Sequence, residues 1–128
     1  MFDQIAVLDI AQSLARHAGQ RQVVTARNMA NADTPGYRAR DLRPFSELVD
    51  AGPGTELRRT RPGHLSGGAD GAAAPLRDDG GPAAPNGNTV SLEREMVRAT
   101  DLRRQHDLAL GVYSKSLDIL RATLGRAR

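Results

Sequence analysis

The feature that most constrains this chain is a regular spacing of apolar residues between positions 91 and 124. The spacing alternates steps of four and three, and only two of its ten positions are polar: Leu92, Met96, Ala99, Arg103, His106, Leu110, Tyr113, Leu117, Leu120 and Leu124. Such steps place residues on one face of an α-helix that packs lengthwise against another helix. The spacing therefore predicts one long helix with an apolar seam.

The ends of this helix carry the residue types that helix termini favour. Ser91 is a good N-cap, and Glu93 and Glu95 stand in the first turn, where the helix dipole favours acids. Gly125 is a natural C-terminal stop. We expect a helix over about residues 91 to 124.

A second helical periodicity covers about residues 3 to 31. Its apolar face includes Val7, Ala11, Leu14, Ala18 and Thr25. At 1.5 Å per residue the two helices are about 40 to 50 Å long. Their seams can cover each other, but the apolar width that remains needs neighbouring molecules.

The region between the helices has no such period. Residues 51 to 88 contain nine Gly and five Pro in 38 positions, a composition typical of linkers and exposed loops. The expected fold is mainly α, with the two long helices paired as a coiled coil and an irregular middle or short β hairpin. We expect three segments: an N-terminal helical segment over residues 1–34, a connecting region over residues 35–90, and a C-terminal helical segment over residues 91–128.

Composition excludes several classes of function. Only four residues are aromatic, so a bulky core is not expected, and the chain has no cysteine for a disulfide or a thiolate metal site. His17, His64 and His106 are too far apart in sequence to predict a metal site. No phosphate-binding glycine loop or catalytic set stands out. We expect no enzyme, no cofactor and no metal.

Charge and hydropathy set further limits. The net charge is +3, with the two signs interspersed rather than clustered, which argues against a nucleic-acid interface. No stretch approaches the roughly 20 apolar residues that cross a bilayer. The N-terminal residues lack a basic region before their apolar ones, so we expect no secretory signal peptide and no membrane insertion.

The stretch NMANADTPGY, residues 28 to 37, follows the first helix. Pro35 prevents the helix from continuing, and Pro35-Gly36 suits the centre of a type II turn. A helix end followed by a fixed turn accounts for these residues. It leaves open why positions 28 and 31 are both asparagine.

The longer stretch RNMANADTPGYRARDL closely resembles the N-terminal signature of the flagellar rod, hook and hook-associated axial proteins. The matching positions are Asn28, Ala30, Asn31, Thr34, Pro35, Gly36 and Tyr37. In that family the terminal helices pair as the inner layer of a hollow helical assembly. The resemblance implies that the matching residues lie at a subunit interface, with Asn28 and Asn31 bonded to adjacent subunits.

Residues 87 to 124, beginning GNTVSLEREM, resemble the end of the short proximal-rod members of this family. Larger members carry central domains for which this chain has no room. A sister proximal-rod subunit and a non-flagellar coiled-coil adaptor remain as alternatives.

We expect the two helices to contact each other along a seam. Its strongest positions are Val7, Leu14, Leu92, Met96, Leu110, Tyr113, Leu117 and Leu120.

The resemblance implies a structural subunit of the basal body rod that transmits torque across the periplasm. Implied partners are copies of itself, other rod proteins, the rod–MS-ring junction protein FliE and the type III export gate, through which such subunits pass without a cleaved signal peptide. Phe45 and Val49 match the form of a family element recognised at that gate. The same two residues also suit ordinary packing.

Overall fold

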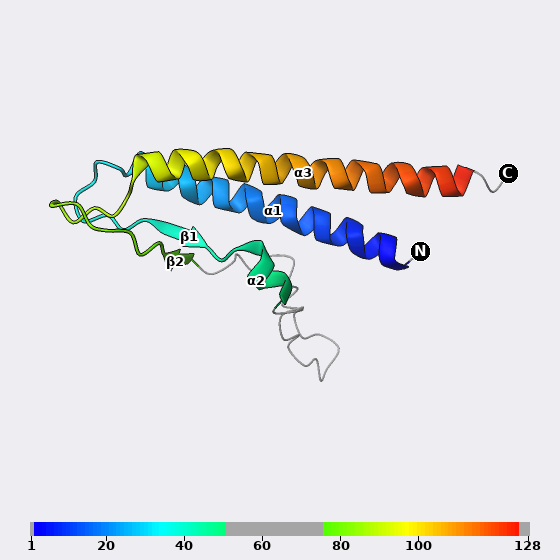
Figure 1. Ribbon diagram of the computed structural model, residues 1–128, viewed down its shortest axis with the longest axis horizontal. Coiled ribbons are helices and arrows are strands. Elements are labelled where there is room, and N and C mark those ends of the chain that lie inside the picture. Colours follow the sequence, from blue (N-terminus) through cyan, green and yellow to red (C-terminus); the bar gives the residue numbers. More distant parts are fainter. Residues whose placement is uncertain (1, 51–75, 126–128) are drawn as a thin grey trace, which may run out of the picture.

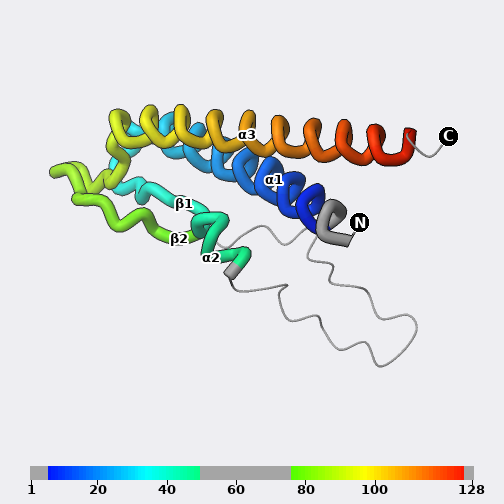
Figure 2. Tube along the Cα trace, turned by 45° about the vertical axis from the view of Figure 1, so that its right-hand side comes forward, coloured from blue at the N-terminus to red at the C-terminus, as the bar shows by residue number. Residues whose placement is uncertain are grey.

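The structure, a computed structural model, describes residues 2–50 and 76–125. Most of the Gly/Pro-rich region predicted as a linker, residues 51–75, lies outside the described residues. Two long helices dominate: α1 (Phe2–Ala30) and α3 (Leu92–Gly125). Both agree with their predicted bounds to within a residue or so. Figures 1 and 2 show them side by side and antiparallel, with both termini at one end. The predicted mainly α fold with paired terminal helices is confirmed.

A small layer covers one side of this helix pair near its loop end (Figure 1). It consists of β1 (Arg40–Leu42) and β2 (Leu76–Asp78), with the short helix α2 (Phe45–Asp50) after β1. The strands are antiparallel and pair Arg40 with Asp78 and Leu42 with Leu76. This is the short hairpin that the sequence analysis allowed for, and it packs on α1 through β1.

The turn after α1 forms as its sequence predicts. The Tyr37 N–H donates to the Thr34 carbonyl at 3.2 Å, so Pro35 and Gly36 are the central residues of a β-turn. Gly36 has φ +73°, the positive value that the third position of a type II turn requires. A residue with a Cβ is strained in that conformation.

The face that α3 turns toward α1 differs from the predicted seam. Its buried residues are Glu95, Leu102 and Ala109. Leu92, Met96 and Leu110 of the predicted seam are 49%, 56% and 50% exposed. The prediction that these three residues contact α1 is therefore wrong. Tyr113 of the predicted seam is also exposed. Leu117 and Leu120, nearer the C-terminus, are half-buried.

The difference is one of rotation about the helix axis. The buried residues Glu95, Leu102 and Ala109 also repeat every seven positions, so they form a line that runs parallel to the predicted seam and is offset from it around α3. On α1, Leu14 is half-buried as expected, but Val7 is exposed.

The buried apolar residues are mostly small, which lets the helices approach closely: Ala11, Ala18, Ala39, Leu42, Leu102 and Ala109. Along α3 none of the described residues beyond Ala109 is buried, and along α1 none of residues 6–10 is. Figure 1 shows the two helices diverging toward the termini. The two helices thus pack against each other at the loop end of the pair and separate toward the end that carries the termini. Neither α1 nor α3, nor any other described helix, has a stretch apolar enough to cross a membrane.

Candidate functional site: a polar junction at the loop end of the helix pair

Asn28, near the end of α1, is completely buried and joins the helix to β1. Its Nδ2 donates to the Arg40 carbonyl at 2.7 Å, and its Oδ1 accepts from the Arg40 N–H at 3.2 Å. The side-chain amide thus satisfies both backbone groups of Arg40, much as a neighbouring strand would. Only an amide offers a donor and an acceptor in this arrangement.

The same amide reaches α3. Asn28 Nδ2 lies 3.3 Å from Glu95 Oε2, and the Tyr37 hydroxyl donates to Asn28 Oδ1 at 3.4 Å. Glu95 is 1% exposed, although carboxylates are rarely buried unless paired. Asn28 therefore connects α1, the turn, β1 and α3 at one point.

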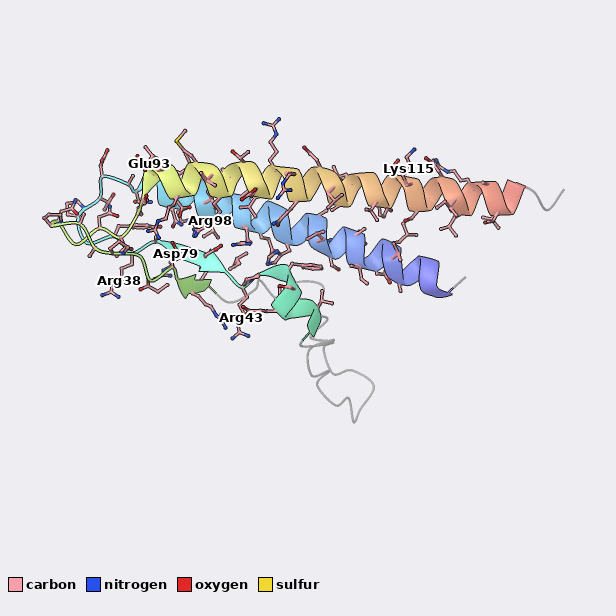
Figure 3. All side chains as sticks on the ribbon, viewed as in Figure 1. Arg38, Arg43, Asp79, Glu93, Arg98 and Lys115 are labelled. Carbon is pink, nitrogen blue, oxygen red and sulfur yellow. The ribbon has the colours of Figure 1, made fainter. Side chains whose placement is uncertain are left out.

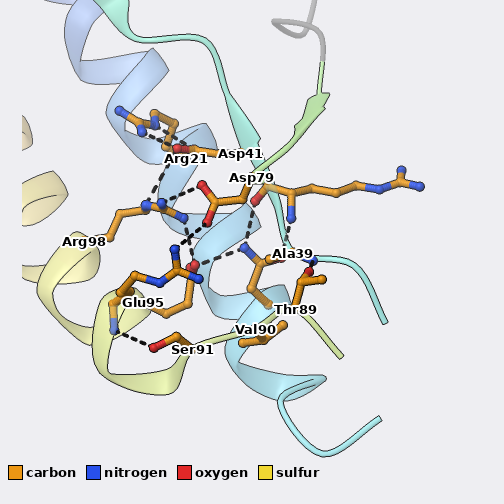
Figure 4. A network of polar contacts seen from close by, with 12 residues as sticks. Arg21, Ala39, Asp41, Asp79, Thr89, Val90, Ser91, Glu95 and Arg98 are labelled. Atoms are coloured by element: carbon orange, nitrogen blue, oxygen red, sulfur yellow. Dashed lines mark hydrogen bonds and ion pairs between the residues drawn. The ribbon is translucent and has the colours of Figure 1, made fainter. Parts of the chain in front are cut away.

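Arg98 places a positive charge next to the buried carboxylate of Glu95. Its guanidinium donates to Glu95 Oε1 at 2.7 Å and to Asp79 Oδ1 at 2.8 Å, and it lies 3.7 Å from Asp41 Oδ2. Arg21 of α1 holds Asp41 from the other side through two nitrogens, one at 2.9 Å. Figure 4 shows this network, and Figure 3 places Arg98 and Asp79 between α3 and the strands.

The network favours the ionised forms of Asp41 and Arg98. Burial by itself would raise the pKa of Asp41, but the hydrogen bonds and charge of Arg21, the charge of Arg98 and the Leu42 N–H outweigh it, so the pKa is lowered. Burial by itself would lower the pKa of Arg98, yet the surrounding carboxylates Asp41, Glu95 and Asp79 raise it. We call the set Arg21, Asn28, Asp41, Asp79, Glu95 and Arg98 the polar junction.

Asn88, just before α3, binds the turn that follows α1. Its Nδ2 lies 2.9, 2.7 and 2.9 Å from the carbonyls of Asn31, Ala32 and Thr34, and its Oδ1 accepts from the Val90 N–H. These carbonyls belong to the turn that follows α1, which ends at Ala30. Asn88, which is buried, reaches them from 54 to 57 residues away and so fixes the turn.

Most of this junction has no signal in the sequence. Glu95 stands in the first helical turn, where the helix dipole favours an acid, and Asn88 is only part of the segment that resembles the rod proteins. One signal was available, since GNTVSLE matched the family while its Asn88 had no assigned role. The partners Arg98, Asp41 and Asp79 carry no local signal, because they are ordinary charged residues until the fold brings them together.

The predicted motif residues separate into two groups. Asn28 belongs to the polar junction and Tyr37 donates to it, whereas Thr34, Pro35 and Gly36 are exposed in the turn. Asn31 is bonded locally, with Nδ2 donating to the Arg27 carbonyl at 2.8 Å and Oδ1 accepting from the Thr34 hydroxyl. The expectation that Asn28 bonds to an adjacent subunit is wrong, because its buried amide is satisfied within its own chain.

Phe45 and Val49, the suggested export element, lie on α2. Phe45 is half-buried, with its ring centroid 5.6 Å from that of His17, while Val49 is exposed. The buried His17 donates from Nε2 to the Arg43 carbonyl at 2.8 Å, if that nitrogen carries the ring proton. Burial lowers the pKa of His17, the Arg43 carbonyl and Asp41 oppose this, and the net result favours the neutral ring. Phe45 therefore packs in the folded chain, as its alternative interpretation held.

The junction has the character of a structural joint. Its acids are each bonded to arginine or to an amide, so none is free to act as a base. Among residues 2–50 and 76–125, no group of three His, Cys, Asp or Glu is placed to hold a metal ion. What the arrangement does is fix two helices and a hairpin in one orientation.

The chain is a pair of long terminal helices that the polar junction joins at the loop end and that separate at the other end. Such an arrangement is typical of a structural subunit rather than of a catalyst. No protein-family model matches the chain. It is 35% identical over 125 residues to the flagellar basal body rod protein FlgB of Escherichia coli (strain K12), covering 89% of this chain and 90% of that protein. It is 33% identical over 129 residues to FlgB of Salmonella typhimurium (strain LT2), covering 91% and 92%. FlgB of Agrobacterium fabrum (strain C58) is 32% identical over 111 residues, with 81% of each chain covered.

The chain belongs to the FlgB family of flagellar basal body rod proteins. It is a structural rod subunit and not an enzyme. The two alternatives, the sister rod subunit FlgC and a non-flagellar adaptor, are not favoured by these relatives.

The two asparagines of the motif should differ in their effect on stability. We expect Asn28→Ala to lower the free energy of unfolding by about 3 kcal/mol, because it leaves buried groups of Arg40 and Glu95 without a partner. Asn31→Ala removes exposed local bonds and should cost less than about 1 kcal/mol. Urea unfolding followed by circular dichroism measures both values. Equal losses would contradict the placement of Asn28 at the junction.

The junction also predicts a dependence on pH. A carboxylate whose pKa is lowered on folding contributes stability above its unfolded pKa of about 3.9, and this is lost as the pH falls through the folded pKa. We expect Asp41→Asn to cost about 2 kcal/mol at pH 7, with the difference from the unmodified chain shrinking below about pH 4. The control is Asp118→Asn, which removes an exposed pair with Arg121 and should change little. A constant difference down to pH 2 would count against the ion pair.

Proposed function

We propose that the chain is an axial subunit of the proximal part of the flagellar rod, assembled helically with copies of itself and with other rod proteins. The observation that carries the proposal is the surface of α3. Large apolar side chains are exposed on both flanks of its contact with α1: Leu92, Met96 and Leu110 on one, and Val97, Leu108, Val112 and Ile119 on the other. Large apolar side chains that stay exposed on both flanks of one helix are typical of a surface that other molecules cover.

The polar junction supports a mechanical role. Torque passes through a subunit without loss only if its helices keep their relative orientation. Ion pairs and the hydrogen bonds of a side-chain amide are directional. The junction therefore resists sliding and rotation of α3 against α1 more specifically than apolar contacts do. On this proposal residues 1–34 and 91–128 form the axial core, and residues 35–90 connect them.

The same proposal includes specific binding partners of the subunit and its route of export. FliE and the type III export gate are the partners that the resemblance implies, with export to the periplasmic rod without cleavage of a signal peptide. Phe45 and Val49 are the residues proposed to meet the gate. Since Phe45 packs on His17 in the folded chain, the element is fully accessible only before folding is complete.

The test of the rod assignment is deletion of the gene in the organism that carries it, with the other flagellar genes intact. We expect basal bodies without a rod and no swimming, and we expect the gene supplied on a plasmid to restore both. Electron microscopy of isolated basal bodies provides the readout. Complete rods in the deletion strain would refute the assignment.

The export element is tested separately with Phe45→Ala. We expect the subunit to accumulate in the cytoplasm and its periplasmic amount to fall at least several-fold. Immunoblots of the two fractions measure this. Ser46→Ala, on the exposed side of α2, is the matched control and should be exported normally. Normal export of the Phe45 variant would remove this residue from the proposed element while leaving the rod assignment untouched.

A further inference from the structure

Asn86 is the only asparagine in the chain that is followed by glycine. It lies in the loop before α3, and its side chain is exposed. In an Asn-Gly sequence the side-chain amide can react with the next backbone nitrogen, because glycine has no Cβ to hinder the approach. The reaction, deamidation, is a covalent change that needs no enzyme. The polar junction does not include Asn86, and the rod assignment does not depend on it.

Deamidation proceeds in two steps. The Gly87 nitrogen attacks Cγ of Asn86, so a Cγ–N bond forms, the bond from Cγ to Nδ2 breaks, and ammonia leaves with the proton that the Gly87 nitrogen gave up. Water then opens the resulting five-membered ring. Breaking the new bond gives Asp at position 86, and breaking the original peptide bond gives isoaspartate, whose backbone runs through Cγ. Water is the only co-reactant, and nothing is oxidised or reduced.

The folded loop holds both reacting groups in other bonds. The Gly87 N–H donates to the Ala84 carbonyl at 2.8 Å, which closes a β-turn and makes the proton harder to remove. The Asn86 Oδ1 accepts from the Asn88 N–H at 3.0 Å, so Cγ turns toward the Gly87 nitrogen only if that bond breaks. Both bonds must therefore open before the ring closes.

The turn after α1 holds this loop in place. The Gly36 N–H donates to the Asn86 carbonyl at 3.0 Å, and Asn88 binds three carbonyls of the same turn. A Cβ on Gly87 would lie 3.4 Å from Gly36 Cα, so the two backbones are in close contact. Figure 1 shows the two segments at the end of the molecule opposite the termini. The loop consequently opens only when it separates from the turn.

We propose that Asn86 is a site of spontaneous deamidation that the fold closes and the unfolded chain exposes. Exposure of the side chain does not decide its reactivity, because Asn86 is exposed in the folded chain while both groups that react are bonded. Reactivity follows the local opening of the loop instead. A folded subunit is therefore protected, and a chain that stays unfolded accumulates the modification.

The two products differ in how they fit the folded loop. Asp at position 86 keeps the backbone and Oδ1, so the bond from the Asn88 N–H remains. Isoaspartate adds one CH2 to the backbone inside the loop that the Ala84 N–H closes by donating to the Asn88 carbonyl at 2.7 Å. Because Gly87 is already in close contact with Gly36, the longer chain has no room beside the turn. Only the Asp form refolds with all these bonds.

The test compares the full chain, folded and unfolded in urea, in the same mildly alkaline buffer. Replacing NH2 by OH adds about 1 Da, which mass spectrometry detects in the tryptic peptide of residues 78–94. Fragmentation of this peptide separates position 86 from Asn88, which is followed by threonine and serves as the internal control. Asn86→Gln sets the background, because its longer side chain would have to close a six-membered ring.

We expect Asn86 to deamidate at least several-fold faster in the unfolded chain than in the folded one, and faster than Asn88 in the same unfolded sample. Equal rates in the two states, or a faster reaction in the folded chain, would overturn the protection by the fold. No deamidation of Asn86 in urea would overturn the site itself.

Asn88→Ala tests whether the loop's own anchoring gives the protection. It removes the side-chain bonds to the turn but keeps the backbone N–H, and circular dichroism shows whether the helix pair still forms. In the folded variant we expect Asn86 to deamidate several-fold faster than in the unmodified folded chain. An unchanged rate would contradict anchoring by the turn.

Asn86→Asp supplies a measurement that does not require the Asn88 variant to fold. We expect its thermal midpoint to lie within about 2 °C of that of the unmodified protein, and a larger drop would contradict the fit of the Asp product. When the urea sample is refolded and passed over a sizing column, we expect a lower ratio of isoaspartate to Asp in the folded fraction than in the starting mixture. An equal ratio would show that the loop accepts both products and would overturn this part of the proposal.

Discussion

The bond network of Asn28 is the interaction on which the rest of the structure depends. One amide holds both backbone groups of Arg40 and touches the carboxylate of Glu95 on α3. Through Glu95 and Arg98 it connects to Asp79 and Asp41, and so to both sides of the hairpin. Removing any single partner leaves another buried charge or donor unsatisfied, so the network forms as a unit.

This network also decides which side of α3 meets α1. Glu95 must point at Asn28, and Leu102 and Ala109 then follow on the same line toward the termini. The apolar seam is displaced to the flank over its first half as a consequence. The buried polar contact thus determines the rotation of the helix, while apolar burial alone would have favoured Leu92 and Met96. The displaced residues remain available for contacts between subunits.

Much of the fold was predictable from local patterns. The two helices, the stop at Pro35 and the turn with positive φ at Gly36 all follow from residue types at fixed spacings. The junction was not predictable in this way. Arg21, Asp41, Asp79 and Arg98 are scattered over the sequence, and pairing them requires knowing which segments the chain brings together.

By itself the sequence determined the elements, the family and the absence of an evident catalytic set, since these depend on periodicity, capping residues and short motifs. Only the tertiary structure decided that Asn28 is an internal joint, that Asn88 binds the turn after α1, and that α3 presents Glu95 rather than Met96 to α1. The physical reason is that periodicity defines an apolar stripe but not its rotation. The rotation is set by where buried polar groups find their partners, and Asn28, the partner of Glu95 on α1, lies 67 residues away in the sequence.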